Sequence, residues 1–163
     1  MDLSIAIMVS RSDKIADELR DITFSQVQRL DEESTDGRSF EFYERSQVTK
    51  AAVYANHLSG VVGNFVESFE AQITAHGNEI SGSCTCGRSG KICKHVITLL
   101  YAWVNDGSEF LNVEQVLSKI KDMEKRRLIE IVSNIIRHEP RYVDLFLSPT
   151  SPEWDEIDLD PDF

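Results

Sequence analysis

All three cysteines of this 163-residue chain fall between positions 84 and 93, and a histidine follows two residues after the last of them. The pattern is C-x-C, a six-residue spacer and C-x-H, formed by Cys84, Cys86, Cys93 and His95. Three thiolates and one imidazole make a closed tetrahedral ligand set for zinc. Cysteines that only fill a core are spread with the apolar pattern, and these are not. The motif therefore predicts one structural zinc ion bound by these four side chains.

The ligand spacing predicts a strand before the spacer and a helix after it. Residues two apart in a strand point to the same side, so Cys84 and Cys86 can face one ion from a strand end. Within a helix, two positions correspond to a rotation of about 200°, which would separate Cys93 from His95. We therefore expect that pair at the start of a helix, whose partial positive charge also favours a thiolate at Cys93. The apolar repeat of that helix is Ile92, Val96, Leu99, Leu100, Trp103 and Val104.

Set between a predicted β-hairpin and an apolar helix, the motif resembles the SWIM zinc finger. The signature of that family is C-x-C, a variable loop and C-x-H, and its ligands map onto the four residues above. SWIM fingers occur in chromatin-remodelling ATPases, transposases and small recombination accessory proteins, and they are implicated in both DNA and protein binding. This chain has Gly87 where many members have proline, and its loop is short, but neither difference touches a ligand. The resemblance covers about residues 36 to 105.

The charge distribution argues against a general nucleic-acid binder, because the net charge is −11. The charge around the zinc-binding motif differs in sign from that of the whole chain. Between Ser81 and Asn105 the only charged side chains are basic, and we predict that they contact nucleic acid: Arg88, Lys91 and Lys94.

No run of about 18 apolar residues is present, so the sequence predicts no membrane span. The apolar stretch at residues 3–9 is short and follows Asp2 instead of basic residues, which argues against a signal peptide. Thiols that are odd in number and gathered in one ligand motif are typical of a reducing compartment, so we expect a cytoplasmic protein.

The chain as a whole predicts an α+β fold, in which a small antiparallel β-meander carries the zinc finger. We divide it into an N-terminal helical segment (1–35), a SWIM-type zinc-finger domain (36–106), a C-terminal helical segment (107–147) and a disordered acidic tail (148–163). In the first segment, Ser12 is a candidate helix N-cap, and the acidic stretch 31–37 is expected to be a solvated loop. Residues 38–45 are ambiguous, because Phe40 and Phe42 alternate as in a strand whereas Phe40 and Tyr43 are spaced as in a helix. The SWIM resemblance implies a short helix here, with an aromatic residue near its end.

Strands are expected at 51–58 with a break at Ser59-Gly60, then at 61–69, 70–75 and 79–83, with a hairpin turn at 76–78. After the zinc-binding motif, Asn112 is a candidate cap for a helix that begins at Val113. A further helix over 124–137 is apolar across a wide face, so we expect it to be well buried.

The last sixteen residues hold six acids, no base and three of the four prolines of the chain, a composition typical of disorder. Apolar side chains interleave with the acids, and we predict that they dock a partner, the alternative being an inert tail that only aids solubility: Trp154, Ile157, Leu159 and Phe163. The final residues 160–163 resemble the acidic tip of bacterial single-stranded DNA-binding proteins. The six acids of this tail are opposite in charge to the three bases near the zinc. We therefore predict that the tail competes with external anions for those bases.

No catalytic triad, phosphate-binding loop or nucleotide fingerprint is present, and four protein ligands leave zinc no open position for water. We therefore expect a protein that is not an enzyme and has no small-molecule substrate. The leading hypothesis is a zinc-binding adaptor for a protein partner, with weak DNA contact, in recombination, repair or chromatin-type assemblies. The alternatives are a direct DNA-binding regulator and a thiol redox protein that uses Cys84 and Cys86.

Overall fold

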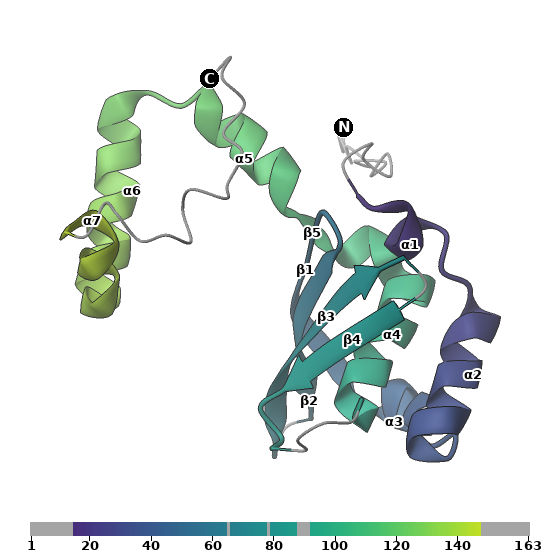
Figure 1. Ribbon diagram of the computed structural model, residues 1–163. Coiled ribbons are helices and arrows are strands. Elements are labelled where there is room, and N and C mark those ends of the chain that lie inside the picture. The colour runs from purple at the N-terminus through teal and green to yellow at the C-terminus, as the bar shows by residue number, and fades with distance from the viewer. Residues whose placement is uncertain (1–14, 65, 78, 88–91, 148–163) are drawn as a thin grey trace, which may run out of the picture. The chain divides into compact units, whose positions relative to one another are not determined.

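The computed structural model describes residues 15–64, 66–77, 79–87 and 92–147 (Figure 1). The chain divides into two compact units, one ending at Leu117 and the other beginning at Ser118. The predicted α+β class is confirmed, since helices accompany a five-stranded sheet. In the described part of the chain, no helix is both long and apolar enough to cross a bilayer.

The first four strands form the predicted antiparallel meander, which runs through β1 (Gln47–Tyr54), β2 (His57–Gly63), β3 (Ser68–His76) and β4 (Glu79–Cys84). A two-residue strand, β5 (Leu111–Asn112), then pairs with β1 in parallel. The order across the sheet is β4-β3-β2-β1-β5, so the sheet is mixed. The sequence did not predict β5, because two residues carry no periodic signal.

The expected break at Ser59-Gly60 is wrong, because the chain turns earlier, at Ala55-Asn56, where Ala55 has φ of 48°. Gly60 lies inside β2, where a Cβ atom would stand 2.9 Å from the Leu99 side chain. Gly60 therefore leaves room for the helix that carries Leu99 to pack closely on the sheet, and it does not interrupt the strand.

The expected strand over 61–69 is also wrong, since β2 ends at Gly63 and β3 begins at Ser68. Asn64 makes the intervening turn. Its side-chain oxygen accepts hydrogen bonds from the Val66 and Glu67 amides at 2.8 and 3.0 Å. Its own amide donates to the Glu67 carbonyl at 2.8 Å. Asparagine favours such local bonds over a continued ladder.

Helix α4 (Lys94–Asp106) forms the centre of the core, and it packs against β2 and β3 of the sheet and against helices α2 and α3 (Figure 1). It is apolar almost all round, as a fully enclosed helix must be. Its buried residues include Val96, Ile97, Leu99, Leu100, Tyr101 and Trp103. Gly82 of β4 admits this helix, because a Cβ there would lie 2.5 Å from Val96.

Three helices precede the sheet: α1 (Asp17–Arg20), α2 (Phe24–Thr35) and α3 (Ser39–Arg45). The candidate cap Ser12 lies outside the described residues. Helix α2 begins with a capping box, in which Thr23 and Gln26 satisfy each other's backbone amides. The expected solvated loop at 31–37 is wrong, because α2 continues to Thr35 and Asp31 is only 1% exposed. Helix α3 confirms the short helix that the SWIM resemblance implied.

Asp31 joins three helices through its buried carboxylate. It accepts hydrogen bonds from the Ser39 amide at 3.2 Å, from the Tyr101 hydroxyl at 3.1 Å and from the Thr35 hydroxyl. Burial, with the nearby Asp31 charge, raises the pKa of Tyr101, so Tyr101 stays a donor. A buried carboxylate is tolerated only when such donors replace its water.

The second unit contains α6 (Lys125–His138), η2 (Pro140–Val143) and α7 (Asp144–Leu147), while α5 (Val113–Lys121) spans the division between the units. Asn112 caps α5 as predicted, since its side-chain oxygen accepts from the Glu114 amide at 3.0 Å. The expected burial of α6 is wrong. None of its residues is buried, and Ile129 is 56% exposed. Inside this unit α6 packs against η2, which is too short to cover a helix of this length.

We predict that Asp31→Ala lowers the free energy of unfolding by about 3 kcal/mol, because it leaves the Ser39 amide and the Tyr101 hydroxyl buried without an acceptor. Urea denaturation of the zinc-loaded protein measures this change. The matched control is Glu33→Ala, an exposed position in the same helix, which should shift the free energy by less than about 0.5 kcal/mol. Equal effects of the two substitutions would contradict the role of Asp31.

Candidate metal centre

Two elements deliver the four ligands. Cys84 is the last residue of β4, and Cys86 follows in the turn after it. Cys93 is the N-cap of α4, with φ −96° and ψ 168°, and His95 is the second residue of that helix. The extended backbone at Cys93 lets its side chain and that of His95 converge. The prediction that this pair lies at a helix start is confirmed.

The turn that carries Cys86 is fixed to the neighbouring strand β3 by two hydrogen bonds between Thr85 and Glu70. The Thr85 amide donates to the Glu70 carbonyl at 3.0 Å, and the Thr85 hydroxyl accepts from the Glu70 amide at 2.9 Å. Cys84 is held opposite Ala71 in the same ladder. The first two thiols are therefore positioned by β3, and the C-x-C geometry does not depend on the spacer loop.

The ligand atoms of Cys84, Cys86, Cys93 and His95 all lie within 4.8 Å of one another. The His95 Nδ1 atom is 3.6 Å from the Cys84 sulfur and 3.9 Å from the Cys93 sulfur. Zinc bonds of about 2.3 Å to sulfur and about 2.05 Å to nitrogen place tetrahedral ligand atoms about 3.6 to 3.8 Å apart. The two nitrogen–sulfur distances are close to this range, and the four ligand atoms are near enough to one another to bind one zinc ion through three sulfur atoms and Nδ1.

The centre is recessed more deeply on the helix side than on the strand side. Cys93 and His95 are 2% and 5% exposed, while Cys84 and Cys86 are half-buried. Burial, with the two other thiols nearby, raises the pKa of Cys84 to about 12. A bare thiolate is therefore unfavourable here, whereas a bound cation deprotonates a coordinating thiol outright. The donor set and its surroundings both suit a metal ion.

Two aromatic rings hold the His95 imidazole. Phe69 of β3 stacks on it with ring centroids 4.4 Å apart, and Phe42 of α3 meets it edge-on at 5.4 Å. Contacts on two sides restrict the rotation of the ring and so support a fixed direction for Nδ1. Sequence reasoning missed Phe69. For Phe42 the only signal was the aromatic residue that the SWIM resemblance implied near the end of the short helix.

The predicted nucleic-acid contacts are described only in part. Lys94 is the first residue of α4, it is exposed, and its ammonium lies 4.2 Å from the centre of the Phe42 ring. Arg88 and Lys91 lie outside the described residues. The four predicted docking residues of the tail, Trp154, Ile157, Leu159 and Phe163, lie outside them as well.

The fold and the ligand geometry together define a closed Cys₃His zinc site between a β-hairpin and a helix. Comparison with protein families matches residues 70–103 to the SWIM zinc finger, and this range includes all four ligands. Comparisons with curated proteins and with solved structures gave no match. The chain thus carries a SWIM zinc finger with one structural zinc, and such fingers mediate protein or nucleic-acid interactions.

We predict one zinc ion per chain by elemental analysis, and substoichiometric zinc in Cys93→Ser. Zinc-finger sites contribute on the order of 10 kcal/mol to folding. The variant should therefore lose the cooperative unfolding of the first unit and expose the apolar face of α4 to a hydrophobic dye. Ser83→Ala, at an exposed position beside the ligands, is the control and should retain its zinc. Undiminished stability of the wild-type chain after chelation would contradict a structural role.

Proposed function

We propose that this protein is a zinc-stabilised adaptor that binds a protein partner in DNA recombination, repair or chromatin-type assemblies, the settings in which SWIM fingers occur. The observation that carries the proposal is the closed ligand set, in which three sulfur atoms and one nitrogen lie within 4.8 Å of one another and can fill all four tetrahedral positions around zinc. A zinc ion of this kind has no site for water or substrate, so its role is to hold structure. We accordingly assign no catalytic activity to the centre.

The location of the zinc supports an adaptor in which the metal sets up a surface. It ties the end of β4 to the start of α4, and α4 carries more buried residues than any other described element. Loss of zinc would release the helix on which α2, α3 and the sheet all pack. The metal therefore stabilises the whole first unit, including surfaces far from the ligands.

Charge favours a protein partner over DNA as the primary ligand. The net charge of −11 repels phosphates at long range. Lys94, the described member of the three predicted contacts, already lies over the Phe42 ring, and that cation–π contact stabilises its present position. Direct DNA binding remains the second candidate, because Lys94 is exposed and the finger carries no acidic side chain between Ser81 and Asn105.

The ligand set speaks against the thiol redox alternative, since thiolates that coordinate zinc are not free to attack a disulfide. Zinc bound through three thiolates also requires that these cysteines stay reduced. This requirement is met in the cytoplasm, which we propose as the location.

We predict that a tagged, zinc-loaded chain isolated from its native host carries a stoichiometric protein partner, and that the complex survives nuclease treatment. Reconstitution from the two purified proteins, followed by calorimetry, measures the interaction directly. A protein adaptor holds its partner without DNA, so digestion should leave both the yield and the affinity unchanged.

Titration of the same chain with duplex DNA provides the comparison. Three phosphate contacts, by Arg88, Lys91 and Lys94, correspond to a log–log salt slope of about −2.7, and Lys94→Gln should reduce it by about 0.9. Lys50→Gln, at an exposed position on β1, is the control and should leave the slope unchanged. Loss of the protein complex on digestion, together with tight, sequence-selective DNA binding, would replace the adaptor by a DNA-binding regulator.

A further inference from the structure

The outer edge of β1 is open along most of its length. β2 pairs with one side of this strand, and β5 pairs with the other side only at Ala52 and Val53. In the described part of the chain, the stretch Gln47–Ala51 has no strand on that outer side. Such an edge presents unpaired backbone donors and acceptors, and it is a template for a further strand.

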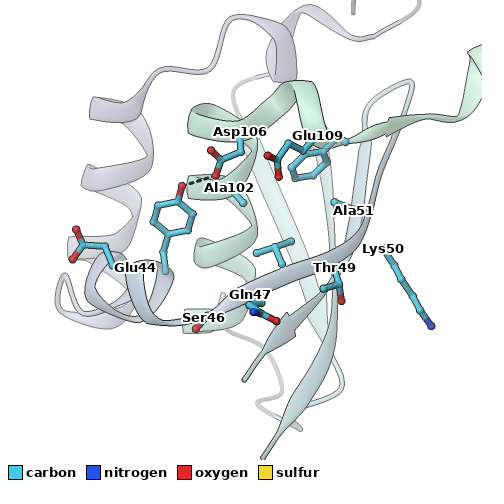
Figure 2. Close-up of a pocket in the computed structure, with 12 residues that line it drawn as sticks. Glu44, Ser46, Gln47, Thr49, Lys50, Ala51, Ala102, Asp106 and Glu109 are labelled. Atoms are coloured by element: carbon cyan, nitrogen blue, oxygen red, sulfur yellow. Dashed lines mark hydrogen bonds between the residues drawn. The ribbon is translucent and has the colours of Figure 1, made fainter. Parts of the chain in front are cut away.

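A cavity of about 660 Å³ lies along this edge (Figure 2). One wall consists of six consecutive residues, 46–51. The opposite wall comes from α3, from the last turns of α4 and from η1 (Gly107–Glu109) with the residue after it. A run of edge backbone beside a space of this size is what an extended peptide needs in order to add to a sheet.

A bulge shapes this edge. The register between β1 and β2 shifts between Thr49 and Ala52, and Lys50 in the bulge has φ of 51°. A left-handed conformation at a residue other than glycine costs on the order of 1 kcal/mol, and such strain tends to occur at functional sites. Bulges also redirect side chains, and here the Lys50 side chain points away from the cavity (Figure 2).

The charged groups that remain around the cavity are carboxylates. Lys50 is the only cation among the lining residues, whereas Glu44, Asp106 and Glu109 all contribute acids. Asp106 and Glu109 lie next to each other at one end of the cavity (Figure 2). The Tyr43 hydroxyl donates to the Asp106 carboxylate at 2.6 Å and so fixes its position. Glu44 and Glu109 are exposed and available to a cation.

A second acidic groove, of about 640 Å³, lies between the N-terminal helices and the β3–β4 hairpin. Its lining includes Asp17, Glu18, Asp21 and Glu33, but from β4 it includes only Ile80. It offers no run of strand backbone to pair with. This groove therefore resembles the β1 cavity in charge but not in hydrogen-bonding capacity, and it provides a matched control.

We propose that the β1 edge cavity binds an extended, lysine- or arginine-containing peptide segment of a protein partner. The segment adds as a strand beside Gln47–Ala51 and places a basic side chain at Asp106 and Glu109. This inference rests on the proposed adaptor function and names the chemistry of the partner. Main-chain pairing supplies the affinity, and the carboxylates supply the preference for basic sequences.

The test uses the full zinc-loaded chain, labelled with ¹⁵N, and a synthetic peptide of about six residues, a typical strand length, that alternates lysine with threonine. We expect chemical-shift changes at the amides of residues 47–51 and 106–109. A peptide with glutamate in place of lysine should not bind. A peptide with every second amide N-methylated should bind much more weakly, because it cannot complete a ladder.

Two charge reversals locate the binding. Glu109→Lys should weaken the affinity for the lysine–threonine peptide about three- to tenfold, since it turns the attraction of a partly exposed pair into repulsion. Glu33→Lys, in the second acidic groove, should leave the affinity unchanged. Shift changes confined to that groove or to the zinc ligands, full affinity in Glu109→Lys, or equal binding of the N-methylated peptide would each overturn the proposal.

The peptide-binding test and the test for a nuclease-resistant partner complex can fail independently. If the peptide does not bind and the nuclease-resistant complex persists in Glu109→Lys, the edge proposal is wrong and the adaptor function stands. If the wild-type chain forms no nuclease-resistant complex, the adaptor function is wrong whatever the peptide does. Joint loss of peptide binding and partner complex in Glu109→Lys, with both retained in Glu33→Lys, supports the two together.

Discussion

Convergence of four side chains on one ion is the constraint on which the rest of this structure depends. It determines that β4 ends at Cys84 and that α4 begins directly after Cys93. A helix that starts at this point passes back across the sheet, where Gly60 and Gly82 leave room for it. Zinc coordination and core packing therefore depend on the same helix, and the free energy of zinc binding adds to that of core packing.

The other side of α4 is organised by a polar interaction. Asp31, which is buried, accepts hydrogen bonds from α3 and from Tyr101 of α4, and so links the N-terminal helices to the central one. On the metal side, Phe42 of α3 and Phe69 of β3 contact the imidazole of His95. Helix α3 thus takes part in both arrangements.

Local spacing determined what the sequence could predict. The ligand set, the helix start at Cys93–His95, the cap at Asn112 and the α+β class all follow from patterns within continuous stretches of the sequence. The missed features depend on distant partners. Burial of Asp31 requires Tyr101, the strand β5 requires β1, and the bulge at Lys50 is defined only against β2. The expected burial of α6 was wrong because a wide apolar face does not specify what covers it.

A zinc ion that is fully enclosed by four protein ligands can act only on structure. X-ray absorption at the zinc edge of the purified protein tests this most directly. We expect a first shell of three sulfur atoms at about 2.3 Å and one nitrogen at about 2.05 Å. A shell with fewer sulfur atoms and an oxygen from water would contradict it, because an open position would make the centre a site for chemistry.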